Sequence, residues 1–244
     1  TRAYNQLKHF IQTAVIRDPY VRWCERTGSQ LMATFLLDLL IMNKKPEDNI
    51  PEQEEGAQSN TEASKEFKDV EGAQEFYQLV RSRLLNVNHW HDVAGTATAD
   101  FQLTDAGGNE VNRSVKKEDY FRINIPGPGS ETGGGFDWVR VEDIEEVKNE
   151  NEEGITIVVR PALNPTNKNP DVAHFFTDEA QSCFMAARKG TKVIAGVFGR
   201  NEKPNTKTKK VIDKVRNEAV ATGAITGFAK LQWKSLVNGL VEDK

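Results

Sequence analysis

Cysteine is scarce in this chain of 244 residues, which contains only two. Cys24 and Cys183 lie far apart in the sequence and in unlike surroundings, so neither a disulfide framework nor a cysteine metal site is indicated. Such sparse cysteine usage fits a reducing compartment, and we expect the protein to be cytoplasmic.

Long hydrophobic runs are also lacking. The longest, LMATFLLDLLIM at residues 31–42, is interrupted by Asp38 and is shorter than the roughly 20 residues of a transmembrane helix. The polar sequence NKKPEDN follows it, where a secretory signal would carry small residues at a cleavage site. The sequence therefore predicts neither a membrane span nor a secretory signal.

Positive charge is not in excess, because 32 Lys and Arg stand against 36 Asp and Glu and leave a formal net charge of -4. This balance argues against a general nucleic-acid-binding protein. The basic run GRNEKPNTKTKK at 199–210 has no interleaved aromatic residues, so we interpret it as a solvated face or a contact for an anionic partner. No cofactor fingerprint is visible, and we expect no cofactor.

The composition changes at Met42 and again near Val70. Residues 1–41 fit two interpretations: upstream read-through that is not part of the native protein, or a helical extension with Leu36, Leu39 and Leu40 on its apolar face. Residues 42–69 are acidic, polar and almost free of aromatic residues, which predicts a disordered leader. We expect a single folded domain over residues 70–244.

Within that domain the pattern is α+β. Apolar residues at helical spacing predict a helix over 71–85, and six alternating or apolar segments between 96 and 200 predict strands joined by hairpin turns. Strands that follow one another without intervening helices favour an antiparallel sheet. The last segment, 206–241, is then a long helix packed across that sheet. We therefore predict a curved antiparallel sheet of about six strands packed by a long C-terminal helix.

The segment INIPGPGSETGGGFDWV at 123–139 joins two of these strands. It has Glu131 where a phosphate-binding loop needs positive charge, and it leads into a strand rather than a helix, so phosphate binding is not predicted. Pro126 and Pro128 end the first strand, and the glycines at 133–135 ease the return. The loop is either a plain solvent-exposed hairpin or a lid over a ligand.

Histidines provide the few candidates for metal binding or catalysis. His89 and His91 lie in the segment HWHD, and His174 lies in VAHFF. Two imidazoles separated by one residue point to opposite sides of an extended chain, so the spacing is not that of a metal site. We interpret them as packing residues and expect no metal; Asp137, Glu142 and Asp143 similarly fit an exposed strand edge better than an acid and base pair.

Small residues recur in the C-terminal helix. Val215, Ala219, Gly223, Gly227 and Leu231 are spaced four apart, which leaves part of one helix face almost bare. Something must approach that face closely. Either bulky sheet residues such as Phe184 and Phe198 fill the space, or a ligand does.

A helix ending in NHWHDVAG, an antiparallel sheet and a long glycine-containing last helix together resemble the helix-grip fold of the START, Bet v 1 and polyketide-cyclase group. The resemblance covers residues 71–241 and rests on the order of elements. It implies a cavity between sheet and helix that binds lipids or other apolar small molecules, sometimes with catalysis.

The leading functional hypothesis is therefore an apolar-ligand-binding domain with the 126–135 loop at the cavity entrance. A protein-interaction or assembly domain is the alternative, and a hydrolase or cyclase using histidines is the third. The predicted ligand-binding residues are Trp90, Phe121, Ile123, Trp138, Phe184, Phe198, Gly223 and Gly227.

Overall fold

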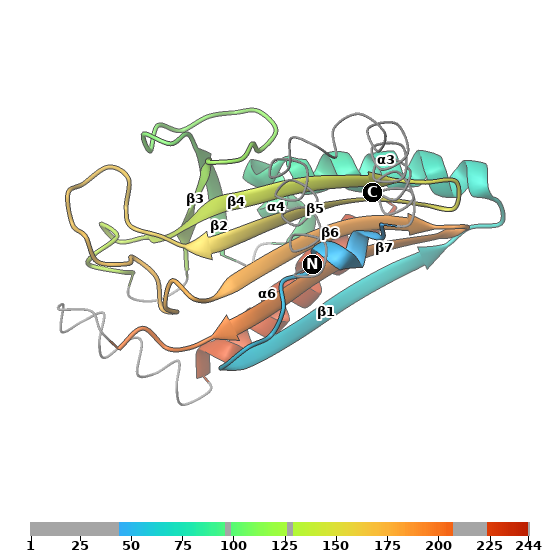
Figure 1. Cartoon of the computed structure of the whole chain (residues 1–244). Coiled ribbons are helices and arrows are strands. Elements are labelled where there is room, and N and C mark those ends of the chain that lie inside the picture. Colours follow the sequence, from blue (N-terminus) through green and yellow to red (C-terminus); the bar gives the residue numbers. More distant parts are fainter. Residues whose placement is uncertain (1–43, 96–98, 126–128, 207–223, 244) are drawn as a thin grey trace, which may run out of the picture.

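The structure is a computed structural model that describes residues 44–95, 99–125, 129–206 and 224–243. It has one antiparallel sheet with its α-helices packed on a single face, which is the α+β class predicted (Figure 1). The strands are β1 (Ala57–Glu66), β2 (Asp100–Thr104), β3 (Tyr120–Asn124), β4 (Asp137–Lys148), β5 (Glu152–Pro161), β6 (Gln181–Lys189) and β7 (Lys192–Glu202). The helices are η1 (Pro46–Asn49), α3 (Val70–Leu85), η2 (Val87–His89), α4 (Trp90–Ala94) and α6 (Ala224–Leu240).

The sheet has seven strands in the order β1-β7-β6-β5-β4-β3-β2. Strands β2 to β7 are sequential neighbours, as the hairpin turns predicted, and the first strand returns to pair with the last. This order of elements is that of a helix grip: one strand, two α-helices, six further strands and a final helix. The predicted fold is therefore confirmed, with one strand more than expected.

The additional strand is β1, and it corrects the disordered leader predicted over residues 42–69. Alternate residues of β1, such as Thr61 and Ala63, are half-buried, and the whole strand pairs with β7. Its sequence AQSNTEASKE is small and polar, and backbone pairing to β7 rather than apolar side chains holds it in place. Of the other predicted boundaries, residues 1–41 lie outside the described residues.

The first long helix follows β1 directly. The Asp69 side chain caps α3 by accepting a hydrogen bond from the Gly72 amide at 2.8 Å, which satisfies one of the free amides at the helix start. The buried side of α3 consists of Ala73, Phe76, Tyr77, Val80, Leu84 and Leu85. This helical spacing is what the sequence predicted, and it directs one stripe of α3 at the sheet.

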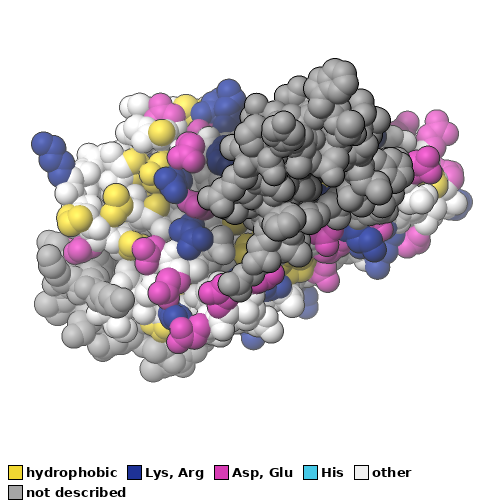
Figure 2. Space-filling model, in the orientation of Figure 1, with side chains coloured by type: hydrophobic (Ala, Val, Ile, Leu, Met, Phe, Trp, Pro, Cys, Tyr) yellow, Lys and Arg dark blue, Asp and Glu magenta, His cyan; other side chains and the backbone are white. Residues whose placement is uncertain are grey.

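The two faces of the sheet differ in what covers them. Helices α3, α4 and α6 pack with the main core on one face, which we call the inner face. The opposite, outer face carries η1 and a smaller apolar cluster that includes Val158, Met185 and Phe198. In the view of Figure 2, acidic and basic side chains are interspersed over the described surface. Within the described ranges, no helix is long and apolar enough to cross a membrane.

Candidate functional site

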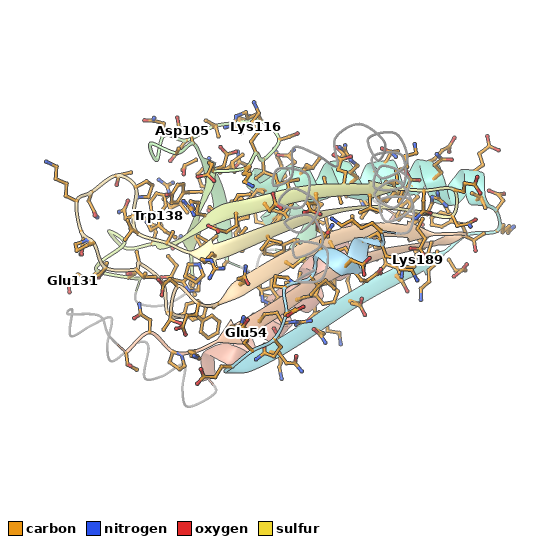
Figure 3. The ribbon with its side chains drawn as sticks, in the orientation of Figure 1. Glu54, Asp105, Lys116, Glu131, Trp138 and Lys189 are labelled. Carbon is orange, nitrogen blue, oxygen red and sulfur yellow. The ribbon has the colours of Figure 1, made fainter. Side chains whose placement is uncertain are left out.

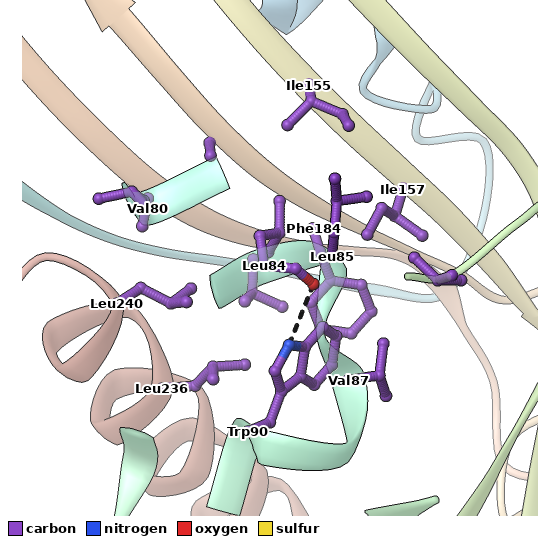
Figure 4. Close-up of a cluster of buried hydrophobic side chains, with 14 of the residues drawn as sticks. Val80, Leu84, Leu85, Val87, Trp90, Ile155, Ile157, Phe184, Leu236 and Leu240 are labelled. Carbon is purple, nitrogen blue, oxygen red and sulfur yellow. Dashed lines mark hydrogen bonds between the residues drawn. The ribbon is translucent and has the colours of Figure 1, made fainter. Parts of the chain in front are cut away.

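An aromatic cluster occupies the inner face between the sheet and the helices. The Trp90 ring from α4 lies 4.7 Å from the Phe184 ring of β6 and 5.6 Å from the Phe121 ring of β3, measured between centroids. Its indole nitrogen donates a hydrogen bond to the Leu84 carbonyl at 3.1 Å (Figure 4). Trp90 is therefore both packed and hydrogen-bonded, as a buried tryptophan requires.

The structure brings four of the predicted ligand-binding residues together. Trp90, Phe121, Ile123 and Phe184 all belong to the inner core. The rings of Trp90, Phe121 and Phe184 pack against one another, so bulky side chains fill this part of the inner face.

Phe198 and Trp138 lie on the outer face, away from that cluster. Phe198 packs with Val158 and Met185, because its neighbour Val197 takes the inner position on β7. The Trp138 nitrogen donates to the Gly133 carbonyl at 3.0 Å, under the loop that was predicted to be the entrance. Figure 3 shows Trp138 towards the same end of the sheet as Glu131. Both residues are thus corrections to the predicted site.

The part of that loop that is described is closely tied together. The Ser130 hydroxyl accepts a hydrogen bond from the Gly133 amide at 3.0 Å, and the Ser130 carbonyl accepts one from Gly135 at 2.7 Å. The bond from the Trp138 nitrogen to the Gly133 carbonyl then joins the described part of the loop to Trp138. Residues 126–128 lie outside the described part of the chain.

The described part of the C-terminal helix packs on the sheet through a side that does not include Leu231. Leu231, the last member of the four-residue spacing, is 68% exposed. The side that packs consists of Gln232, Trp233, Leu236, Val237 and Leu240. Gly223 lies outside the described residues, and Gly227 lies in the first turn of α6, whose surroundings are not described.

Trp233 is the aromatic residue of the site that sequence reasoning missed. Its ring lies 5.4 Å from Phe184 and 6.1 Å from Phe101, and it is only partly buried. Trp233 is therefore the outermost ring of the aromatic cluster, and it belongs to α6. The sequence KLQWKSL gave a signal, because Trp233, Leu236 and Leu240 follow helical spacing.

Beyond Phe184 and Trp233, the inner face continues with small side chains. Ser182 lies opposite Gly199, and Gly199 lies opposite Ser59, so these three residues form one row across β6, β7 and β1. The row lies on the inner face because Phe184, two residues from Ser182, belongs to the inner core. Ser182 and Ser59 are half-buried, in contrast to the fully packed Phe184.

A carboxyl group lies over this row of small residues. The Ser59 hydroxyl donates a hydrogen bond to Glu202 Oε1 at 3.3 Å, and a side chain at Gly199 would collide with that carboxylate. Burial raises the pKa of Glu202, while the Ser59 hydrogen bond and the charges of Arg200 and Lys230 oppose the shift. The Lys230 interaction places α6 close to this end of the sheet.

The histidines do not converge on one site. His89 Nδ1 and His91 Nε2 lie 2.9 and 3.0 Å from the Asp92 carboxylate at the exposed end of α4. The His89 hydrogen bond lowers the pKa of Asp92. His174 is elsewhere and stacks on Phe175 with centroids 4.2 Å apart. Among the described residues, no group of three or more His, Cys, Asp or Glu side chains could hold a metal ion.

The candidate acidic residues are also separated. Asp137 is 1% exposed and lies on the inner face opposite Ile123, whereas Glu142 accepts a hydrogen bond from Arg140 at 2.9 Å near a bulge in β4. Asp143 binds Lys117 at 3.1 Å at the surface. Glu142 and Asp143 thus form ion pairs, whereas the buried Asp137 corrects the exposed strand edge predicted for it.

A polar groove of about 780 Å³ lies on the outer face between the 49–55 segment and residues of β4, β5, β6 and β7. Acidic side chains outnumber basic ones in its lining, and Lys203 lies 2.6 Å from Glu55 and 2.9 Å from Glu179. The basic run predicted at 199–210 therefore contributes Lys203 to ion pairs in its described part. Such a lining does not suit an apolar ligand.

No protein-family model matches this chain, and no curated protein does either. Norcoclaurine synthase from Thalictrum flavum is similar in structure, with 9% identity and a TM-score of 0.35 over 79% of this chain and 96% of its own. Major latex-like protein 151 from Panax ginseng has 14% identity and a TM-score of 0.31, over 70% of this chain and 97% of its own.

The di-domain ARO/CYC BexL from the BE-7585A biosynthetic pathway has 11% identity and a TM-score of 0.31. The similarity covers 92% of this chain and 61% of BexL, so this chain spans less than two thirds of that protein. At these TM-scores the fold assignment rests on the strand order and helix positions of this chain.

Proposed function

We propose that this chain is a binding domain for an apolar small molecule, held on the inner face between the sheet and α6. The observation that supports this most is the change in side-chain size along that face. Bulky rings meet at Phe184 and Trp233, and the next row consists of Ser182, Gly199 and Ser59. An apolar molecule that packs beside such small side chains gains about 25 cal/mol per Å² of apolar surface buried.

The walls of the proposed site suit an apolar ligand. Val159 lies opposite Ser182 and is 2% exposed, Val197 neighbours the row on β7, and Trp233 forms the edge toward the aromatic cluster. His89, His91 and His174 lie outside this site, and the function proposed here is binding. Specificity then depends on the shape of this space and on its few polar groups.

Two neighbouring residues on β6 offer a matched test. Ser182 and Gln181 are both half-buried but lie on opposite faces of the sheet. We expect Ser182→Phe to occupy the proposed space and to weaken binding of an apolar fluorescent probe at least tenfold, with little change in melting temperature. Gln181→Phe, on the outer face, should bind the probe as the parent does.

The result that would contradict this proposal is a loss of stability in Ser182→Phe. If the row is already packed, Ser182→Phe overfills it and lowers the free energy of unfolding by about 1 to 3 kcal/mol. A destabilised Ser182→Phe together with a parent that does not bind the probe would show that the inner face is a closed core.

A further inference from the structure

Glu202 is an unexpected residue on an apolar inner face. Its carboxyl group lies over Gly199, next to the Ser59 hydroxyl, and so within the row of small residues described above. Placing a carboxylate in a partly buried position is costly unless it is paired or well hydrogen-bonded. The position therefore requires an explanation beyond packing.

The contacts of Glu202 within the described residues are modest. Its one described hydrogen bond comes from the Ser59 hydroxyl at 3.3 Å, which is long for a bond between two oxygen atoms. The nearby Arg200 guanidinium is directed elsewhere: it donates to the Ser59 carbonyl at 3.1 Å and to Asn60 Oδ1 at 2.8 Å. A carboxylate can accept about four hydrogen bonds, so among the described residues Glu202 uses only part of its acceptor capacity.

The other polar groups nearby are two hydroxyls and the Lys230 ammonium. Ser59 and Ser182 flank Gly199 on neighbouring strands, and Lys230 interacts with Glu202 electrostatically but is exposed on α6. The Trp233 and Phe184 rings lie on the apolar side of the same space. The proposed site thus has an apolar end at Trp233 and Phe184, and a polar end where the Glu202 carboxylate is the main hydrogen-bond acceptor.

We propose that Glu202 anchors the polar head of the ligand, and that this ligand is amphipathic, with an apolar body and a cationic amine head. This inference rests on the proposed function of the inner face. The amine donates to the Glu202 carboxylate, whose charge it neutralises, while the apolar body packs against Trp233 and the adjacent β-strands. A ligand with a carboxylate head would instead place two negative charges together.

A series of ligands with one apolar chain and different heads tests this assignment in the full chain. Dodecylamine, dodecanol and dodecanoate should compete with an apolar fluorescent probe in that order of affinity at pH 7, with amine and acid differing at least tenfold. Glu202→Gln should abolish most of that difference by weakening amine binding, while dodecanol binding stays within about twofold. Glu75→Gln, on the exposed side of α3, is the control and should leave the order unchanged.

The outcomes separate the two proposals. Equal binding of all three heads, or an unchanged preference for the amine in Glu202→Gln, would overturn the assignment of Glu202 while leaving apolar binding intact. Failure of every head group and of the probe would overturn the proposed function itself. Because Gln keeps the shape of Glu and can still accept the Ser59 hydrogen bond, the variant should fold, and its near-UV circular dichroism verifies this.

Discussion

The partly buried Glu202 carboxyl is the residue whose charge most affects the inner face. Burial raises its pKa in the folded chain above the unfolded value, so the folded state disfavours the ionised form. Ionised Glu202 therefore lowers stability at pH values above its folded pKa. Stability is regained as the pH falls through the folded pKa toward the unfolded pKa, because the folded state then binds the proton more tightly.

The raised pKa of Glu202 leads to a prediction for the stability of the ligand-free protein. Glu202→Gln should have a higher melting temperature than the parent at pH 7, and the advantage should shrink toward zero as the pH falls to about 4.5, the ordinary value for glutamate. Melting curves between pH 7 and pH 4.5 measure it. A variant less stable than the parent at pH 7 would show that the carboxylate is stabilised in the fold.

Alternation along a strand shows that neighbouring residues lie on opposite faces of the sheet, but it does not show which face the helices cover. In VIAGVFGR, both Val197 and Phe198 are apolar, and the pattern states that they face opposite sides but not which side is covered by helices. Phe198 is one of the predicted site residues, and the structure places Val197 rather than Phe198 on the inner face. Trp138 and Val139 differ in the same way on β4.

Helix α6 depends on a close approach to α4. A side chain at Gly239 would overlap the Val93 carbonyl, which is backbone and cannot move aside as a side chain can. Alanine gains about 1 kcal/mol of helix propensity over glycine, but the collision separates the two helices. We therefore expect Gly239→Ala to lower the free energy of unfolding by about 1 to 2 kcal/mol.

Asn238 is the matched control for this change. It precedes Gly239 in α6 and is exposed, so Asn238→Ala gains helix propensity without meeting α4 and should be neutral or slightly stabilising. Urea unfolding of the two variants compares them directly. If Gly239→Ala has the same free energy of unfolding as Asn238→Ala, the contact between α4 and α6 is not tight.

At the scale of helices and strands, the sequence predicted those elements that have a clear apolar periodicity. The six strands β2 to β7 and helix α3 each have a clear pattern, and all were predicted with nearly their observed bounds. Strand β1 was missed because Ser59, Thr61 and Ser64 give it no apolar signal. An edge strand stabilised by backbone pairing to β7 cannot be seen until the partner strand is known.

For the whole molecule, the order of elements predicted the helix grip, and the additional strand β1 lies beside β7. The candidate site was only half predictable. Large aromatic residues such as Trp90 and Phe184 are visible in a sequence, and they proved to be packing residues at the edge of the proposed space. The residues that shape that space, Ser182, Gly199 and Glu202, became apparent only from the pairing of three strands.

Native mass spectrometry of the purified full chain tests the central claim most directly. If the inner face holds an apolar small molecule, the spectrum should show the chain with one bound compound, or should acquire one bound dodecylamine per chain when this amine is added. Ser182→Phe should lose that species and Gln181→Phe should retain it. A spectrum with only the bare chain under all these conditions, for the parent as for Ser182→Phe, would contradict the account.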